Sequence, residues 1–303
     1  MSRLATSVCG IALRNPVIAA SGTFGYGLEF AKQVDLDSLG GLVVKGLSRE
    51  PIEGNPAPRL YETAAGMINS IGLQNVGVRA FVAEKLPALA KLRTAVIANI
   101  FGYQTEDYVE VARVLEDHEG LAAYELNVSC PNTKHGGIYF SSDPALLSEV
   151  VSAVKRVLRR PLIVKLSPNV AAIEPLARAA EEGGADALSL VNTFVALAID
   201  AHTRKPRIGA GFGGLSGPAI KPIALRLVCQ AARSVKIPVI GLGGIATGED
   251  AAEFLIAGAS AVQVGTATFW DPQSPARIAR ELGEFLEREG IGNVREIVGT
   301  LEM

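Results

Sequence analysis

The sequence is poor in cysteine, in long apolar runs and in any excess of one charge. Its 303 residues include three cysteines, Cys9, Cys130 and Cys229, without a C-x-x-C pair, which argues against a secreted disulfide framework and a zinc ribbon. Four thiolates ordinarily hold an iron–sulfur cluster, so three cannot bind one in that way. A net charge of −2 with both signs interspersed argues against nucleic acid or an anionic membrane as the main partner.

No stretch reaches the ~18–20 apolar residues of a membrane span, and the N-terminus lacks the basic segment and apolar run of a signal peptide. We therefore expect a cytoplasmic protein. A chain of this length can bury roughly three quarters of its unfolded surface, and no proline- or glycine-rich linker divides it. We expect one domain over residues 1–303.

Eight short apolar runs alternate with amphipathic stretches along the chain. Most runs are continuously apolar, as expected for parallel strands that are covered on both faces. The runs are residues 16–20, 41–44, 95–100, 123–128, 161–166, 187–191, 238–241 and 261–264. The amphipathic stretches, which predict helices, include residues 107–116, 144–157, 173–182, 222–234 and 249–257. This alternation predicts an α/β fold, a closed (β/α)₈ TIM barrel, with a doubly wound open sheet as the alternative.

Two long connections follow predicted strands, at residues 48–65 and 194–217. Both leave the carboxyl ends of their strands, which is the face where barrel enzymes carry their chemistry. Connections of that length are usually functional. We therefore expect inserted loops around a site at the C-terminal face of the barrel.

Glycines gather after the last two predicted strands, as Gly243-Gly244 and Gly265 before Thr266, and the second long connection closes in a glycine-rich segment that ends at Gly217. Glycine lets backbone N–H groups point at an anion, and a following helix start adds its positive end. One such pair alone would be explained by a tight turn. Three clusters at these places predict a phosphate site.

Two lysines, Lys45 and Lys165, directly follow apolar runs on different predicted strands. Lysine is seldom buried without a partner, and a stem that lies along the rim with its ammonium in water would also explain each one. Taken as a pair, they are two cations that face an electron-rich ligand. A flavin fits, because its reduced ring carries negative charge near one edge.

Four asparagines, Asn69, Asn127, Asn132 and Asn192, fall near the mouth of the predicted barrel. Each offers a donor and an acceptor, and one alone would be explained by a turn or a helix cap. Together they suit a planar heterocycle that bears carbonyl and N–H groups. Asn127 carries the most weight, because strand interiors are depleted in asparagine.

Cys130 stands beyond an apolar run in the polar segment NVSCPNTKHGG. An isolated cysteine is commonly an inert, buried residue. A polar loop at a strand end is instead a place for a reactive group on a mobile lid, and from the residues alone both interpretations stay open. Cys9 and Cys229 lie in an N-terminal segment and a predicted helix, and we interpret them as structural.

Several segments together resemble the class 1 dihydroorotate dehydrogenases. They are NVSCPNTKHGG, GMINSIGLQNVGV, VVKGLS, VNTFVALAID, GGLSGPAIKPIALR and GGIATGEDAAEFLIAGASAVQVGTA, and the likeness runs from about Leu13 to the C-terminal helix. Each motif alone is moderately specific, and their order makes the set highly specific. The NSIGLQN form at 69–75 and the KHGG at 134–137 are most like the NAD-linked class 1B catalytic subunit.

The resemblance implies FMN-dependent oxidation of dihydroorotate to orotate in pyrimidine biosynthesis, with Cys130 as the general base. The single FMN would contact Ser21, Lys45, Gly46, Asn99, Asn127, Lys165, Val191, Gly217, Gly243, Gly244, Gly265 and Thr266. The pyrimidine would be held by Lys45, Asn69, Ser70, Ile71, Gly72, Leu73, Asn127, Asn132, Asn192 and Thr193. No metal site is expected on this chain.

In class 1B enzymes a partner subunit carries FAD and a 2Fe-2S cluster and passes the electrons to NAD. The resemblance therefore implies a heterotetramer of two catalytic and two electron-transfer chains, built on a homodimer core. The shortage of cysteine fits a cluster that is held by the partner.

Other interpretations stay open at this point. A fumarate-linked class 1A enzyme also lacks a cluster. A related flavin-dependent dihydropyrimidine dehydrogenase shares the Asn-x-Ser-Cys-Pro pattern but typically has a different residue after the proline, so Asn132 favours orotate. A Schiff-base lyase or isomerase on a phosphorylated sugar would use Lys165 and the phosphate glycines. A non-catalytic binder of a phosphorylated ligand would leave Cys130 and the paired lysines unexplained.

Overall fold

Eight parallel strands form a closed barrel at the centre of the computed structural model, which describes residues 3–129 and 140–303. Each strand pairs with the next barrel strand along the chain, and the last, β16, closes on the first, β3. The strands are β3 (Val17–Ala19), β4 (Gly41–Val43), β7 (Ala95–Ile100), β8 (Ala123–Asn127), β9 (Leu162–Lys165), β10 (Ala187–Leu190), β15 (Val239–Leu242) and β16 (Ala261–Val264). The predicted (β/α)₈ barrel is confirmed, and each strand overlaps one of the eight apolar runs.

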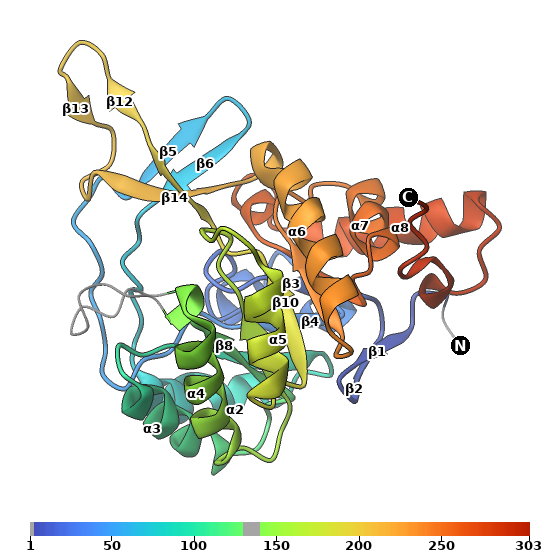
Figure 1. Ribbon diagram of the computed structural model, residues 1–303, viewed down its shortest axis with the longest axis horizontal. Helices are drawn as coiled ribbons and strands as arrows, with labels where there is room; N and C mark the ends of the chain where they lie inside the picture. The colour runs from blue at the N-terminus through green and yellow to red at the C-terminus, as the bar shows by residue number, and fades with distance from the viewer. Residues whose placement is uncertain (1–2, 130–139) are drawn as a thin grey trace.

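Helices surround the barrel (Figure 1). The longer ones are α3 (Thr105–Glu116), α4 (Pro144–Lys155), α5 (Glu174–Glu182), α6 (Lys221–Ser234), α7 (Gly248–Ile256) and α8 (Ser274–Arg288). A further helical stretch between β4 and β7 combines α1 (Val78–Ala80), the π-helical turn η3 (Phe81–Lys85) and α2 (Leu86–Leu89). Short 3₁₀ turns complete the set: η1 (Leu28–Phe30), η2 (Leu36–Ser38), η5 (Phe140–Ser142), η6 (Pro218–Ile220), η7 (Thr266–Phe269) and η8 (Val294–Ile297).

The five predicted helices correspond to α3 through α7, and the sequence explains where two of them begin. Asp143 caps α4, because its side chain accepts the N–H groups of Ala145 and Leu146. Thr247 and Asp250 form a reciprocal capping box at the start of α7. Within the described ranges, no helix is both long and apolar enough to cross a bilayer.

The lower end of the barrel, where the strands begin, is filled with apolar side chains. Each of the eight strands contributes one buried residue to this layer: Ile18, Val43, Ile97, Ala123, Ile163, Ala187, Ile240 and Ala261. An antiparallel hairpin of β1 (Thr6–Val8) and β2 (Ile11–Leu13) covers the layer, and its Val8 and Leu13 belong to the same cluster. Burial of this apolar surface closes the barrel at one end and stabilises the fold.

The two long connections come together above the other end of the barrel as one antiparallel sheet. Its order is β11 (Phe194–Leu197), β14 (Phe212–Ser216), β6 (Gly66–Asn69) and β5 (Leu60–Thr63). The connection between β11 and β14 extends into a small hairpin of β12 (Ile199–Asp200) and β13 (Lys205–Pro206), which projects away from the barrel (Figure 1). The insertions expected from the sequence therefore form a wall beside the C-terminal face, although the first runs past the expected residues 48–65 and includes β6.

Candidate functional site

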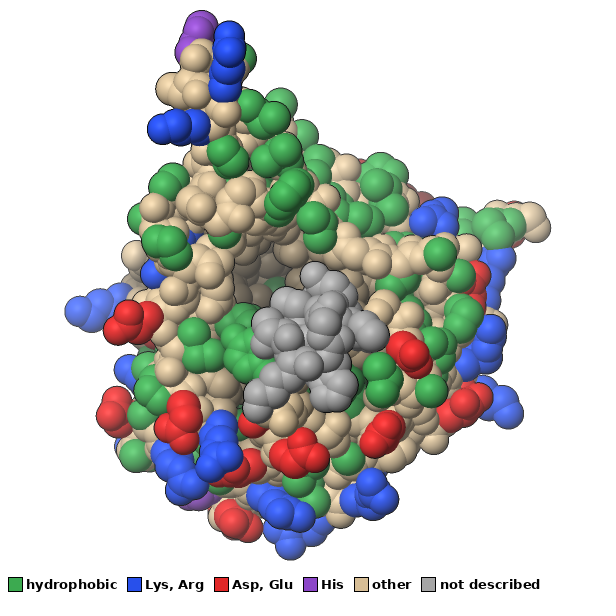
Figure 2. All heavy atoms as spheres, turned by 60° about the vertical axis from the view of Figure 1, so that its left-hand side comes forward, with side chains coloured by type: hydrophobic (Ala, Val, Ile, Leu, Met, Phe, Trp, Pro, Cys, Tyr) green, Lys and Arg blue, Asp and Glu red, His purple; other side chains and the backbone are tan. Residues whose placement is uncertain are grey.

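A cavity of about 690 Å³ opens at the C-terminal face of the barrel, beside the inserted sheet. Figure 2 shows the surface hollowed below the projecting hairpin. All the predicted site residues that the structure describes line this one cavity: Ser21, Lys45, Gly46, Asn69, Ser70, Ile71, Gly72, Leu73, Asn99, Asn127, Lys165, Val191, Asn192, Thr193, Gly217, Gly243, Gly244, Gly265 and Thr266. Cys130 and Asn132 lie outside the described residues, although Ser129, which precedes Cys130 in the chain, lines the cavity.

The floor of the cavity follows from the two-residue period of the strands. Two positions beyond each apolar residue of the lower layer, the same face of the strand again points inward. This second layer is largely polar and consists of Ala20, Lys45, Asn99, Glu125, Lys165, Ser189, Leu242 and Gln263. The interior of the barrel therefore changes from apolar to polar within one strand repeat, immediately below the cavity.

The two predicted lysines differ in their surroundings. Lys165 is only 6% exposed, and its ammonium forms an ion pair with Glu125 at 3.5 Å. Lys45 is half-buried, and its pKa is lowered first by burial and then by the positive charge of Arg59. No described carboxylate forms an ion pair with Lys45. Lys165 is therefore already held in place by an ion pair, whereas the charge of Lys45 is available to a negatively charged ligand at the floor.

Asparagine side chains from different strands meet on the wall of the cavity. Asn127 Oδ1 accepts the backbone N–H of Ser129 at 3.2 Å and the side-chain amide of Asn192 at 3.4 Å, which joins the ends of β8 and β10. Asn192 Oδ1 in turn accepts the backbone N–H of Thr193 at 2.8 Å. The amides are thus orientated by the protein itself.

On the inserted sheet, Asn69 Nδ2 donates to the carbonyl of Gly214 at 3.2 Å, across the β6–β14 pair. Gly214 has to be glycine, because a Cβ there would lie 2.0 Å from Thr193 Oγ1. The tight packing of Gly214 against the Thr193 side chain brings Asn69 and Thr193 to the same wall, although they are far apart in the sequence.

Three polar atoms that line the cavity are buried without a partner among the described residues. They are Thr23 Oγ1, Asn99 Oδ1 and Ser129 Oγ. Buried polar groups in folded proteins nearly always have a hydrogen-bond partner, so these atoms call for a ligand or water with complementary groups. The unpaired amide oxygen of Asn99 fits an N–H donor such as the one on the pyrimidine ring of a flavin.

Glycines line the part of the cavity where the phosphate site is predicted. Gly244 has φ +84° and its Cβ would lie 2.9 Å from both the carbonyl oxygen of Gly217 and the backbone nitrogen of Lys221. Gly217 has φ +96° and its Cβ would lie 2.7 Å from the Cα of Gly66. Side chains are excluded at these two positions, so the backbone N–H groups stay accessible to an anion. Gly265 is less constrained, since the nearest atom to its Cβ would be 3.6 Å away.

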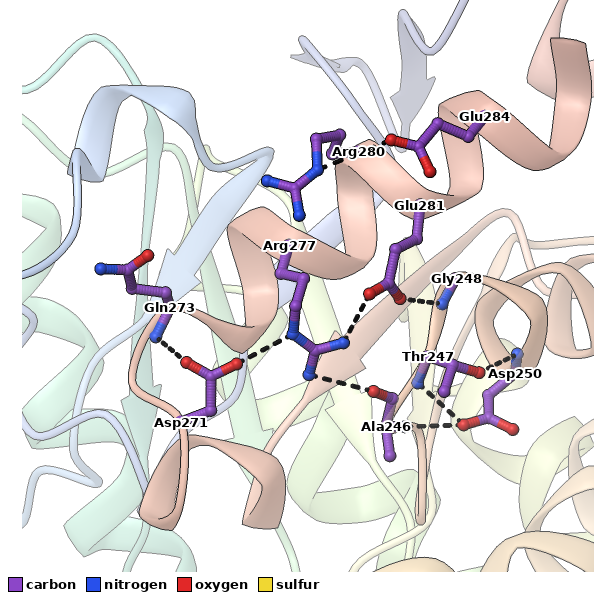
Figure 3. A network of polar contacts seen from close by, with 10 residues as sticks. All are labelled: Ala246, Thr247, Gly248, Asp250, Asp271, Gln273, Arg277, Arg280, Glu281 and Glu284. Carbon is purple, nitrogen blue, oxygen red and sulfur yellow. Dashed lines mark hydrogen bonds and ion pairs between the residues drawn. The ribbon is translucent and has the colours of Figure 1, made fainter.

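Charged side chains hold the loop after β15 in place (Figure 3). Arg277 of α8 donates to the carbonyl of Ala246 at 3.2 Å and to Asp271 and Glu281 at 2.9 and 2.7 Å. Glu281 also accepts the backbone N–H of Gly248 at 2.8 Å. The guanidinium therefore ties the loop after β15 to the helix that follows β16, so both glycine loops are braced before any ligand arrives.

Asp250 adds a second brace to the same loop. Its carboxylate accepts the N–H of Ala246 at 2.8 Å and pairs with Lys221 Nζ at 2.6 Å. Burial alone would raise the pKa of Asp250, but the hydrogen bonds from Lys221 and Ala246 bring it below its ordinary value. The carboxylate is therefore ionised across the physiological range and the brace persists.

Sequence reasoning missed the residues that support the site. Glu125, Ser189 and Gln263 belong to the polar layer of the barrel but do not line the cavity, and Arg277 holds the loop after β15. A glutamate in the middle of the apolar run 123–128 was the available signal for Glu125, because a charge in a buried strand needs partners. Nothing in the sequence marks Arg277 apart from other helix arginines. In the part of the chain that is described, no cluster of His, Cys, Asp and Glu could hold a metal ion.

Comparison with known proteins gives consistent matches. The family model described as "Dihydroorotate dehydrogenase" matches residues 3–286. A protein of Solibacter usitatus (strain Ellin6076) named "Putative dihydroorotate dehydrogenase A (fumarate)" is 80% identical over 300 residues, which cover 99% of each chain. The "Dihydroorotate dehydrogenase B (NAD(+)), catalytic subunit" of Geobacter sulfurreducens (strain ATCC 51573 / DSM 12127 / PCA) is 54% identical over 300 residues, 99% of this chain and 98% of its own. The protein of that name from Geobacter sp. (strain M21) is 53% identical over the same length.

Proposed function

The chain belongs to the dihydroorotate dehydrogenase family, a family of FMN-dependent oxidoreductases, and from this premise we propose that the cavity is where it oxidises dihydroorotate to orotate. The observation that carries the proposal is the meeting of three features in one cavity. These are two lysines at the floor, amides that the protein orientates, and glycine loops in which side chains are excluded. The membership of the family supplies the reaction, and the cavity supplies groups that suit its cofactor and substrate.

FMN would be held along the floor and the glycine loops. The N–H groups around Gly217, Gly244 and Gly265 suit its phosphate, and Asn99 Oδ1 and Lys165 suit the polar edge of its ring. When bound, FMN supplies the acceptor for the hydride that leaves dihydroorotate. Ser21, Lys45, Gly46, Asn127, Val191, Gly243 and Thr266 complete the proposed contact set.

The pyrimidine would lie against the amide wall. Asn127, Asn192 and Asn69 present donors and acceptors from β8, the loop after β10 and β6, which matches a flat ring edged with carbonyl and N–H groups. Lys45 suits the carboxylate, because its charge has no described partner. The segment Ser70 to Leu73 and Thr193 would close around the ring. Asn132 is proposed for the same role from the sequence alone.

Cys130 is proposed as the general base that removes the ring proton. We expect Cys130→Ala to lower turnover by about 10²–10⁴-fold, the usual contribution of a positioned base. Activity of the unchanged enzyme should rise with pH until the thiol ionises, at a pKa near ~8.5 for an ordinary cysteine. The measurement is anaerobic single-turnover reduction of the bound flavin by dihydroorotate across pH.

Two other cysteines serve as controls for this experiment. Cys229 is buried on α6, so Cys229→Ala should leave the pH profile unchanged. Burial, and then the negative charge of Asp186, raise the pKa of Cys9 to about 12, so it cannot account for a titration near neutral pH. A near-normal rate in Cys130→Ala at neutral pH would remove Cys130 from the mechanism.

The most direct test of the function is the visible spectrum of the purified protein before and after anaerobic dihydroorotate. We expect flavin absorbance that bleaches on mixing. A protein that carries flavin but bleaches instead with a uracil-type dihydropyrimidine would belong to the related flavin enzymes. A protein without flavin that is trapped covalently by borohydride with a sugar phosphate would use Lys165 as a Schiff-base amine, and the proposal would fail.

For the electron acceptor, we propose transfer to NAD through a partner subunit that carries FAD and a 2Fe-2S cluster. The relatives at 53–54% identity support this, because their names describe a catalytic subunit of an NAD-linked enzyme. The relative at 80% identity supports fumarate as the second candidate, because its name specifies fumarate. To decide, the chain is reduced anaerobically and mixed alone with fumarate or with NAD. Reoxidation by fumarate at the rate of turnover would establish the second candidate, whereas recovery of a subunit with FAD and iron from native cells would establish the first.

We also propose that the chain works in the cytoplasm as a homodimer core within a larger assembly. Exposed apolar side chains on the inserted sheet and its projecting hairpin support a protein interface, since Val195 and Phe212 are each 64% exposed and Ile199 is 58% exposed. These residues lie near the projecting hairpin, where Figure 2 shows hydrophobic side chains gathered. Light scattering measures the oligomeric state of the wild-type chain and of the Val195→Lys variant. We expect a dimer for the wild type and a weakened dimer for the variant, and a monomer in both would contradict the proposal.

A further inference from the structure

Glu125 is a fully buried carboxylate that lines no part of the cavity. Its side chain is 0% exposed in the polar layer of the barrel, one strand repeat below the cavity rim. One oxygen accepts the amide of Asn99 at 2.7 Å and the ammonium of Lys165 at 3.5 Å. The other accepts the hydroxyl of Ser189 at 2.9 Å and the amide of Gln263 at 2.6 Å. Donors from β7, β9, β10 and β16 thus converge on one side chain.

A buried carboxylate at this depth makes the free energy of folding less favourable. Removing an ion from water costs several kcal/mol, and a well-packed apolar side chain in its place is often neutral or stabilising. The lower layer shows that these same eight strands can fill the barrel with Ile, Val and Ala. Stability therefore does not explain why the layer above is built around a charge.

Two of the four donors, Asn99 and Lys165, line the cavity above. Because Glu125 accepts the Nδ2 group of Asn99, a rotated amide would turn its Oδ1 against the carboxylate oxygen, so Oδ1 is left as the atom without a partner among the described residues. Gly46 leaves room beside that oxygen, since a Cβ there would lie 2.9 Å from it. Glu125 likewise gives the Lys165 ammonium a fixed position and a balancing negative charge.

We propose that Glu125 is a positioning residue for the flavin, which sets Asn99 as an acceptor and Lys165 as a charge-balanced donor beneath the ring. The inference rests on the proposed FMN site and extends it to a residue that touches neither cofactor nor substrate. Glu125 acts through Lys165, so its charge partly offsets the positive potential that favours the reduced, negatively charged ring.

The test is a double-mutant cycle on the midpoint potential of bound FMN. Glu125→Gln keeps the shape and removes the negative charge, so the potential should rise by about 30 mV or more, which is a tenfold change in the equilibrium for two electrons. In a Lys165→Met background the ammonium through which Glu125 acts is absent, so the same substitution should shift the potential by less than about a third of that amount. A merely structural residue would not show this dependence on Lys165.

Glu116→Gln is the matched control. Glu116 is also a buried glutamate, 7% exposed, and is held by Tyr124, Arg159 and Arg160 at the other end of the barrel. Glu116→Gln should lower the free energy of unfolding without changing the midpoint potential of the bound flavin. A potential that Glu125→Gln leaves unchanged, or shifts equally in both backgrounds, would overturn the inference.

Two further outcomes separate this inference from the proposed function. If the wild-type protein binds no FMN, the proposed function fails before Glu125 is tested. If Glu125→Gln does not fold, Glu125→Asp keeps the charge but is one methylene shorter, so it should keep the potential near the wild-type value while weakening FMN affinity about tenfold or more. Affinity and potential both unchanged in Glu125→Asp would overturn the inference as well.

Discussion

The two ends of the barrel interior are built from the same eight strands but have opposite chemistry. At the lower end, residues such as Ile97 and Ile163 form a closed apolar layer under the β1–β2 hairpin. Two positions further along, the same strands present Asn99 and Lys165 around the carboxylate of Glu125. The difference shows how one architecture separates its tasks, because the lower layer holds the strands together and the upper layer holds charges ready for a ligand.

The largest effect is expected from breaking the upper layer. Lys165→Met leaves Glu125 without its counter-ion, which should lower the free energy of unfolding by about 3–5 kcal/mol and reduce FMN content. Urea unfolding of the FMN-free protein measures this loss. Adding Glu125→Gln should restore most of the stability but not the turnover, because no buried charge is then left unpaired. A single Lys165→Met variant as stable as wild type would show that the pair is not coupled as described.

A smaller loss of stability is expected from the lower layer. Ile163→Ala removes buried methylene groups directly below Lys165 on β9 and should cost about 3 kcal/mol. The turnover per bound flavin should stay at the wild-type value, because the cavity lies above the layer that changes. Thermal unfolding and flavin-normalised activity are the measurements. A fall in activity per flavin would mean that the two layers are not independent.

The smallest effect is expected from a substitution in the glycine loops that line the predicted phosphate site. Gly244→Ala combines a left-handed backbone with a contact to the Gly217 carbonyl and should cost about 1–2 kcal/mol, seen mainly as weaker FMN binding. Gly290→Ala is the control, because Gly290 has φ +68° with nothing within 4 Å of its Cβ and lies beyond the end of α8. Fluorescence titration of FMN should separate the two variants. Equal affinities would mean that Gly244 is not part of the phosphate site.

Local patterns in the sequence predicted the barrel and most of the ends of its strands. Continuous apolar runs gave the eight strands, and the residues that end them, such as Lys45, Asn127 and Gly243, do line one cavity. Helix starts were predictable where a side chain caps its own backbone, as Thr247 does. These features depend on neighbours in the sequence, so the sequence alone predicts them well.

Contacts between distant segments could not be predicted in the same way. Asn69 meets Gly214 across the β6–β14 pair, and the four donors to Glu125 come from four strands. No local pattern specifies such pairings, because they depend on how the insertions and the barrel close in space. Cys130 and Asn132 remain predictions from sequence and resemblance.

The pairing of β14 with β6 also bears on how this protein tolerates change in its length. The tip between β12 and β13, at residues 201–204, is exposed, so insertions or deletions there should have little effect on the rest of the chain. A deletion of one residue within β14 would instead slip its register, turn every side chain to the opposite face and pull Gly217 away from its neighbours. Natural variation in chain length among relatives should therefore accumulate at the tip and be absent from Phe212–Ser216.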